Sequence, residues 1–448
     1  MIPEDLHSLE KDELIALVLK LSEQLQVLQA RIEALEAPAK TPRNSSLPPS
    51  KGHKSNLASG KKRTRGKRKG ISRVLTENPD YIRDVFAETC SNCNATVSAC
   101  DHTQVHAYDH IDLPPIQPIT TRVCLHSGHC PGCGARIKGQ PPADMPLGSP
   151  FGPGIAALVV YLHSQQMISY VRLREVLHDL FSLEVSEGAI ANMLKRSGVC
   201  FSREAERIEA HVRNAPVIAS DETSARVMGQ TCWQWVFASS QAVTHRIAVT
   251  RGKAVVADFL DGIKPQVWVS DRYGGQLGHA YHHQACLAHL LRDAQYAIDA
   301  GDTVFAPGFR FLLKRALAIG RRRDELKDTT LKNYQRDLLR HLDRLLACKP
   351  DGMAGIKFRN AMEKAKDNLF VFITRRDVPP TNNLSERLLR MSGIFRKVTN
   401  GFRSVWGAQV YADICSVTAT AKIHGINALD AIRKCLAGYS IIPIHKQG

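Results

Sequence analysis

Apolar residues repeat in sevens near the start of the chain. The first heptad position holds Leu14, Leu21, Leu28 and Leu35, and the second apolar position holds Val18, Leu25 and Ile32. This combination favours a parallel two-stranded coiled coil. The alternative is an amphipathic helix packed on its own domain. Because the pattern lasts from residue 9 to residue 36 and Pro38 then stops it, we expect residues 1–37 to form a coiled coil that joins copies of the chain.

A strand pattern begins after Pro216. The predicted elements are strands at Val217–Ser220, Cys232–Ala238 and Val243–Val249, a helix at Lys253–Leu260, and a fourth strand at Gln266–Ser270. Three strands, a helix and a fourth strand form the front half of a ribonuclease-H-like fold. The first and fourth strands are neighbours in that fold and end in Asp221 and Asp271, so we expect the two carboxylates to lie side by side.

Helical patterns flank these strands. Residues 152–200 contain a candidate helix-turn-helix, in which Ser186 caps a second helix, Glu187–Arg196. An ordinary helical hairpin has the same spacing, and the motif alone does not decide between them. Between Asp271 and Glu386 the chain is too long for a loop. We expect an all-helical insertion at residues 290–378, with a long helix at Asp324–Leu346.

The chain is strongly basic. Its 60 lysines and arginines outnumber its 43 acidic residues, which gives a net charge of +17. Such an excess favours a polyanionic partner, nucleic acid before an anionic membrane surface. No apolar run is long enough to span a membrane. Residues 38–75 have the composition of a flexible linker, and its basic residues are candidates for contacting phosphates unless the segment is only a solvated tail. These are Lys61, Lys62, Arg63, Arg65, Lys67 and Arg68.

Twelve cysteines occur in a chain whose first residues do not resemble a signal peptide. A reducing compartment is therefore expected, in which cysteines serve as metal ligands or buried thiols. Two Cys-x-x-Cys pairs predict a structural Zn²⁺ ribbon within residues 76–148. The predicted ligands are Cys90, Cys93, Cys130 and Cys133, and the candidates that could compete are Cys100, Cys124, His126 and His129.

Glu386 is the only acid in a basic segment that follows Pro379 and Pro380. Taken alone, the segment predicts a capping box with Asn383 at the N-cap. Asp221 and Asp271 change this interpretation, because adjacent carboxylates favour a shared divalent cation. Two such cations roughly 4 Å apart support phosphodiester chemistry. We therefore favour Glu386 as a third metal ligand. The expected phosphate-binding residues are Arg387, Arg390, Arg396 and Lys397.

Cys286-x-x-His289 lies on an apparent helix. The two side chains could bind a metal, with Cys232 as a weak third candidate. A packed thiol beside a hydrogen-bonded histidine is the alternative.

Nearly the whole chain resembles the transposase of the insertion-sequence-sixty-six family. The resemblance rests on Asn44–Ser50, Ile111–Pro115, Cys130–Cys133, Asp221–Thr223, Asp271–Tyr273, Cys286–His289, Thr381–Arg387, Arg396–Lys397 and Thr420–Gly425. It implies a DDE-type enzyme of the bacterial cytoplasm (the nucleoid) that uses Mg²⁺ or Mn²⁺ to cut element ends and join them to target DNA. Asp221, Asp271 and Glu386 would then be the metal-binding triad. The resemblance also implies small accessory proteins as partners. Because related transposase families share the Cys-x-x-His motif, Cys286 and His289 become stronger candidates for accessory site residues.

Three residues depart from the family's usual pattern, namely Met391, Arg272 and Leu287, which indicates a divergent subgroup. The predicted protein is a multidomain α+β homo-oligomer that binds DNA and no membrane. Its predicted parts are a coiled coil (1–37), a basic linker (38–75), a zinc-binding domain (76–148), a helical DNA-binding segment (149–209), a ribonuclease-H-like catalytic core (210–410) and a C-terminal helical segment (411–448). A nuclease or junction resolvase on the same fold, and a non-catalytic DNA-binding relic, are the alternatives.

Overall fold

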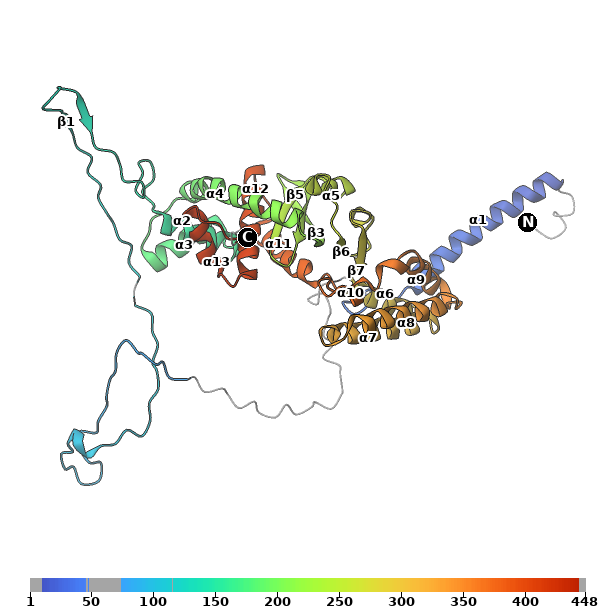
Figure 1. The fold of residues 1–448 in the computed structure, drawn as a ribbon, viewed down its shortest axis with the longest axis horizontal. Helices are drawn as coiled ribbons and strands as arrows, with labels where there is room; N and C mark the ends of the chain where they lie inside the picture. The colour runs from blue at the N-terminus through green and yellow to red at the C-terminus, as the bar shows by residue number, and fades with distance from the viewer. Residues whose placement is uncertain (1–9, 46, 48–73, 115, 443–448) are drawn as a thin grey trace.

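The computed structural model describes residues 10–45, 47, 74–114 and 116–442. It is a mixed α+β structure in which helices pack on both faces of a five-stranded sheet (Figure 1). The basic residues predicted at positions 61–68 lie outside the described residues. No helix in the described ranges is both long and apolar enough to cross a membrane.

The sheet has the strand order β5-β4-β3-β6-β7. Its strands are β3 (Val217–Val227), β4 (Gln230–Ala238), β5 (Val243–Ala248), β6 (Val267–Ser270) and β7 (His282–Ala285). β3 pairs with β4 in antiparallel fashion and with β6 in parallel. The prediction that the first and fourth predicted strands are neighbours is therefore confirmed. Helix α5 (Lys253–Leu260) connects the two halves at its predicted position, and β7 is a strand that the pattern did not predict.

β3 is longer than predicted. It does not end before Asp221 but continues to Val227, because its antiparallel pairing with β4 extends to the end of the strand. The parallel pairing with β6, in contrast, stops at Ala219 opposite Val269. Asp221 therefore lies in the strand, two residues beyond the point where β3 separates from β6.

One face of the sheet packs against helices from both sides of the core sequence. These are α2 (Pro153–Ser164), α3 (Tyr170–Phe181), α4 (Glu187–Arg213), α12 (Val405–Ile423) and α13 (Ala428–Leu436). Ser186 caps α4 as predicted, since its hydroxyl accepts a hydrogen bond from the Ala189 amide at 3.1 Å. The helix continues well past Arg196, because buried apolar residues such as Phe201 and Ile208 extend its packed face.

Helix α12 covers the free edge of β5. The Ser416 hydroxyl accepts from the His245 amide at 2.8 Å, and the Thr420 hydroxyl accepts from the Val243 amide at 3.0 Å. Side-chain hydroxyls thus satisfy backbone groups that an edge strand leaves unpaired.

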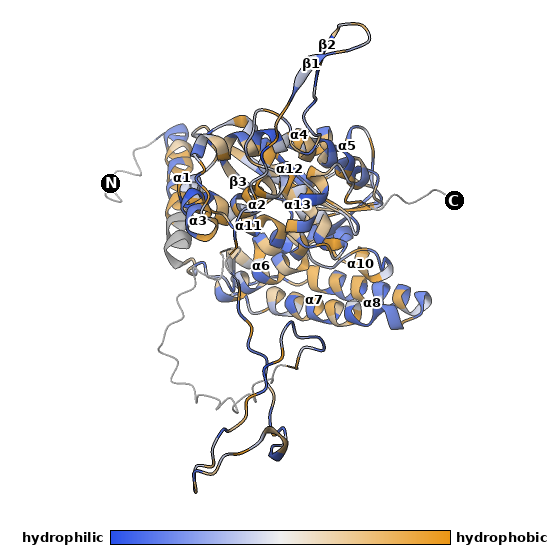
Figure 2. Ribbon diagram, turned by 90° about the vertical axis from the view of Figure 1, so that its left-hand side faces the viewer, coloured by the Kyte–Doolittle hydropathy of each residue, from blue (hydrophilic) through white to orange (hydrophobic). Residues whose placement is uncertain are grey.

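The opposite face of the sheet packs against a second apolar cluster built from the helices that follow β7. They are α6 (Leu287–Asp299), α7 (Phe305–Arg321), α8 (Asp328–Leu346), α9 (Gly352–Lys364) and α10 (Val371–Thr374). Apolar and polar residues mix along α7 and α8 (Figure 2), and the apolar ones include the buried Phe309 and Leu338. The helix expected from Asp324 begins at Asp328, after a 3-10 turn at Arg323–Glu325.

Upstream segments extend away from this core. Helix α1 (Lys11–Glu36) spans the predicted heptads, and its described heptad residues Leu14, Val18, Leu21, Leu25 and Leu28 are exposed. A short hairpin, β1 (Ser127–His129) with β2 (Arg136–Lys138), carries the second Cys-x-x-Cys pair between its strands. Figure 1 shows that this hairpin and α1 lie at opposite ends of the view.

Candidate active site

Two aspartates occupy equivalent positions on neighbouring strands. The parallel register pairs Val217 with Val267 and Ala219 with Val269. Asp221 and Asp271 each follow the last paired residue by two positions. Both carboxylates are therefore at the carboxyl end of the parallel pair, where parallel strands bring their following residues to one edge.

Local hydrogen bonds orient the two carboxylates. Asp221 Oδ1 accepts from the Glu222 amide at 2.9 Å, and Asp271 Oδ1 accepts from the Tyr273 amide at 2.9 Å. The Ser270 hydroxyl lies 3.0 Å from His283 Nε2, which links the end of β6 to β7. The Asp271 carboxylate therefore sits on a turn that the sheet holds from both sides.

Glu386 comes from α11 (Asn383–Thr399). Its Oε1 atom lies 3.5 Å from His289 Nδ1 and 3.4 Å from a guanidinium nitrogen of Arg292, both on α6. The capping box predicted for Asn383 is wrong: the helix begins one residue earlier, with Asn382 at the N-cap and no side-chain capping bond. Glu386 is consequently one position beyond the one a capping box requires, and its side chain is free for another role.

The negative charges of neighbouring acids act on Asp221, although the described residues whose ligand atoms all lie within 4.8 Å of one another are Cys286, His289 and Glu386 and not the three predicted acids. Burial raises the pKa of Asp221 to about 8, and the negative charges of Glu222, Asp271 and Glu386 add to that rise. Like charges in a shared, poorly solvated space disfavour ionisation of each other. A divalent cation would relieve this repulsion, and carboxylate oxygens are the ligands that Mg²⁺ prefers. The donor set therefore fits a hard divalent cation.

Glu222 is a residue of this region that the sequence interpretation missed. Its side chain is 1% exposed and forms an ion pair with Arg251 at 2.6 Å. Gln276 Nε2 also donates to its carboxylate, at 2.5 Å. Burial raises the pKa of Glu222, and these two donors oppose that rise. The sequence signal for Glu222 was its position directly after Asp221. Adjacent residues of a strand point to opposite faces, however, and the sequence pattern did not indicate Arg251 or Gln276 as its partners.

Cys286 and His289 lie beside Glu386. Ligand atoms of these three residues are within 4.8 Å of one another, and Cys232 does not belong to the group. Cys286 is the N-cap residue of α6, and burial raises the pKa of its thiol. Burial and the neighbouring Arg292 lower the pKa of His289. A neutral imidazole next to a carboxylate could either bind a metal or orient Glu386.

The comparison with protein-family models gives one match. The model described as the IS66 family of transposases covers residues 148–410, which is more than half of the chain. The chain belongs to the IS66 transposase family. This match contains all three carboxylates and the elements that carry them. None of the curated proteins matches the chain. A transposase acts on DNA, and the DDE class to which this family belongs uses divalent metal ions.

The basic residues predicted for this transposase follow Glu386 along α11. Arg387, Arg390 and Lys397 are exposed. Arg396 is different, because its guanidinium donates to the carbonyl and hydroxyl of Ser224. That contact ties the C-terminal half of α11 to β3.

The four predicted zinc ligands form two matched turns. The Cys90 amide donates to the Ala95 carbonyl at 2.9 Å, and the Cys130 amide donates to the Ala135 carbonyl at 2.8 Å. Left-handed residues close both turns, Asn94 with φ 57° and Gly134 with φ 71°. The turns are not brought together. The β1–β2 hairpin and the segment around the 3-10 turn Ala99–Asp101 lie far apart in both Figure 1 and Figure 2. The structure thus shows two separate Cys-x-x-Cys turns, and the zinc ribbon stays a prediction.

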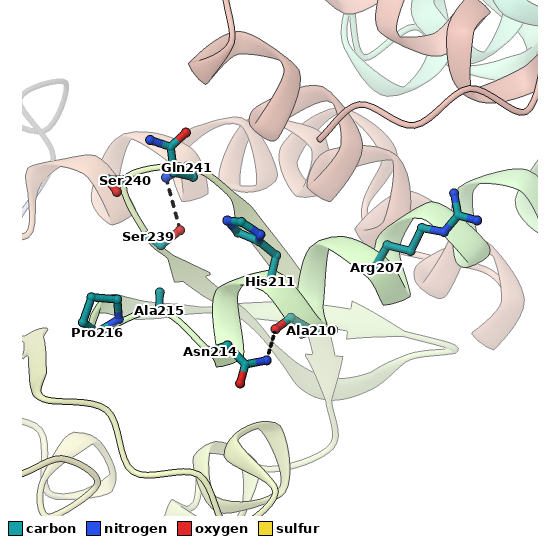
Figure 3. Close-up of a pocket in the computed structure, with 9 residues that line it drawn as sticks. All are labelled: Arg207, Ala210, His211, Asn214, Ala215, Pro216, Ser239, Ser240 and Gln241. Carbon is teal, nitrogen blue, oxygen red and sulfur yellow. Dashed lines mark hydrogen bonds between the residues drawn. The ribbon is translucent and has the colours of Figure 1, made fainter. Parts of the chain in front are cut away.

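A described pocket lies elsewhere. It has a volume of about 560 Å³ and is lined by the end of α4, the connection from α4 to β3 and the β4–β5 turn (Figure 3). Pro216, Gln241 and Arg207 are among its lining residues. None of the three predicted acids is among the residues that line it, so this cavity does not contain the carboxylate site.

Proposed function

We propose that this transposase cuts the ends of its insertion sequence and joins them to target DNA, with Asp221, Asp271 and Glu386 as its metal-binding carboxylates. The observation that supports the proposal is the placement of three acids on adjoining elements, since Asn382 at the start of α11 bonds to Ser220 beside Asp221. Two are at matching positions beyond the β3–β6 register, and the third, from α11, adds to the rise in the pKa of Asp221. A cluster of this kind at the edge of a sheet suits metal-assisted phosphoryl transfer.

A ribonuclease-H-like core is part of the proposal. It is supported by three antiparallel strands followed by a helix and two parallel strands, in the order β5-β4-β3-β6-β7. The helices α6 to α10 would form the insertion that separates the second aspartate from the glutamate. This topology gives two acids from the sheet and leaves the third to a later helix.

Bound Mg²⁺ or Mn²⁺ would activate the attacking oxygen and stabilise the leaving oxygen of a phosphodiester. The protein's own residues would bind and orient the DNA. Arg387 and Arg390 are exposed within about one turn of Glu386 and would hold phosphates beside the carboxylates. Arg292 and His289 contact Glu386 and would hold its side chain against α6.

The remaining parts of the proposal concern assembly and DNA recognition. Exposed apolar positions on α1 support a coiled coil between copies of the chain. The matched turns at Cys90 and Cys130 support a structural Zn²⁺ site. This site requires the two turns to come together, so that Cys93 and Cys133 complete the four ligands. Residues 149–209 and the basic linker would contact the element ends. Small proteins of the same element are proposed partners, and the bacterial nucleoid is the proposed location.

A joining assay tests the proposed activity. Purified protein would be incubated with Mg²⁺, a plasmid and a short DNA duplex that carries a pre-cleaved element end. The variants Asp221→Asn, Asp271→Asn and Glu386→Gln would be compared with Glu363→Gln, which alters an exposed acid on α9. We expect the wild type and Glu363→Gln to join DNA, and each triad variant to lose at least about 100-fold of that activity while still binding DNA.

The alternatives give different results in the same assay. Cleavage of DNA without any joining would favour a nuclease or junction resolvase. DNA binding without chemistry in every protein would favour a relic, unless adding the element's small accessory proteins restores joining.

A further inference from the structure

Asn382 connects α11 to the first strand of the site. Its side chain is 1% exposed and its Nδ2 donates to the Ser220 carbonyl at 2.7 Å. Ser220 directly precedes Asp221. The amide side chain makes no capping bond to α11 itself, so helix capping does not account for its burial.

Cys286 connects α11 to the other strand. Its own amide donates to the carbonyl of Ser270, the residue before Asp271, at 2.8 Å. Its Sγ accepts a hydrogen bond from the backbone N–H of Asn382 at 3.1 Å. The Cys286 side chain is also 1% exposed. The thiol is therefore a buried acceptor between the start of α6 and the start of α11.

These contacts form one continuous chain from Ser220 through Asn382 and Cys286 to Ser270. The third acid belongs to the same chain, because the Glu386 amide donates to the Asn382 carbonyl at 3.2 Å in the first turn of α11. Asp221 and Asp271 thus each follow a residue whose carbonyl these bonds fix. Glu386 is one helical turn from Asn382, which the same bonds hold.

The tether matters most for Glu386. Sheet hydrogen bonds already align Asp221 with Asp271, but α11 begins far later in the chain and belongs to no strand pair. Arg396 fixes the C-terminal half of α11 to Ser224, several turns away from Glu386. At the N-terminal end, the Leu287 amide also donates to the Pro380 carbonyl, at 3.0 Å. The side chains of Asn382 and Cys286 therefore hold the end of the helix that carries the acid.

We propose that Asn382 and Cys286 are positioning residues that set the spacing of the three carboxylates for divalent-metal binding. This inference rests on the proposed function, because it takes Asp221, Asp271 and Glu386 as the metal ligands. Residues that orient metal ligands typically change metal affinity by about 10- to 100-fold when they are replaced. A merely structural role would lower stability and leave the affinity of the folded protein unchanged.

The test measures Mn²⁺ binding by electron paramagnetic resonance on the full chain. The variants are Asn382→Ala, Cys286→Ala and Cys286→Ser, and Asp221→Asn identifies the triad's share of the bound ion. Thr420→Val is the matched control, since its buried hydroxyl ties α12 to β5 with bonds of 3.0 and 3.1 Å and lies on neither α6 nor α11. Tryptophan fluorescence in urea checks that each variant is folded.

We expect Asn382→Ala and Cys286→Ala to weaken Mn²⁺ binding by about 10-fold or more, and Cys286→Ser to restore much of it, because serine keeps an acceptor. Thr420→Val should bind Mn²⁺ as the wild type does. Equal affinity in Asn382→Ala, Cys286→Ala and the control would overturn the inference. If Asn382→Ala does not fold, the difference between Cys286→Ala and Cys286→Ser decides the question. If Asp221→Asn binds Mn²⁺ as tightly as the wild type, the triad itself is wrong and the proposed function fails with it.

Discussion

Asp413 on α12 is a buried carboxylate whose replacement should stabilise the protein. It is 4% exposed, and the only neighbour that donates a hydrogen bond to it among the described residues is Gln409, whose Nε2 lies 2.9 Å from Oδ1. Burial raises its pKa from the ordinary 3.8 to about 6, and the charges of Glu206 and Glu209 add to the rise. Asp413→Asn keeps the acceptor for Gln409 and removes the buried charge.

The sign and size of the effect follow from proton linkage. The folded pKa of Asp413 is above its unfolded value, so the folded protein binds more protons between pH 3.8 and about 6. The free energy of unfolding therefore falls as pH rises through that window, and the full cost is present above it. The difference between 3.8 and about 6 corresponds to roughly 3 kcal/mol as an upper estimate.

Urea unfolding followed by tryptophan fluorescence measures this effect. All four tryptophans, Trp233, Trp235, Trp268 and Trp406, belong to the sheet or to α12, so the signal reports on the unit that contains Asp413. The stability gain of Asp413→Asn over the wild type should be near zero at pH 4 and approach about 3 kcal/mol at pH 7.5. Asp144→Asn, which changes an exposed acid, is the control. A gain that does not change with pH, or a variant that is less stable at pH 7.5, would refute the reasoning.

Four further predictions concern other parts of the chain. Arg323→Lys should lower stability by about 1–3 kcal/mol in a thermal melt, because lysine cannot reproduce the guanidinium's bonds to four carbonyls of the segment at 372–378. Gly401→Ala should lower the free energy of unfolding by more than about 1 kcal/mol, since φ is +101° and a Cβ would lie 2.7 Å from the Arg226 carbonyl oxygen. Gly393→Ala is the control, and it should be tolerated because a Cβ there meets nothing within 4 Å. Elemental analysis should find zinc in the wild type and a loss of it in Cys90→Ser, and equal zinc content would contradict the four-thiolate site. In analytical ultracentrifugation the full chain should be a dimer and the chain without α1 a monomer, and the same number of copies in both would contradict the coiled coil.

Much of the core could be predicted from alternation and from turn residues. The strands that became β4, β5 and β6 and the helix α5 have strong periodic patterns, and the neighbouring positions of Asp221 and Asp271 followed from their order. β7 could not be predicted in this way. Its four residues, His282–Ala285, are mostly polar, and Gln284 is buried there only because its side chain bonds to the backbone of Leu369 and Phe372.

The candidate site was less accessible to sequence reasoning. The three acids were predicted from their positions, since Asp221 and Asp271 each follow an apolar run and Glu386 is the acid of a basic segment. The contacts that organise them involve backbone carbonyls at Ser220 and Ser270 and a thiol acceptor at Cys286, which no spacing rule reveals. Arg396 illustrates the reverse case, because its charge suggested a phosphate contact whereas its guanidinium bonds to Ser224 in the folded protein.

The most direct test of the account is a change of metal preference at Asp221. The variant Asp221→Cys replaces a hard oxygen ligand with a softer thiolate, which tolerates Mn²⁺ far better than Mg²⁺. Joining of a pre-cleaved end would be measured in each ion for the wild type, Asp221→Cys and Asp221→Asn. We predict that the wild type joins DNA in both ions, that Asp221→Cys joins only in Mn²⁺, and that Asp221→Asn joins in neither. If both variants joined DNA in Mg²⁺ as efficiently as the wild type does, the claim that Asp221 holds the catalytic metal would be contradicted.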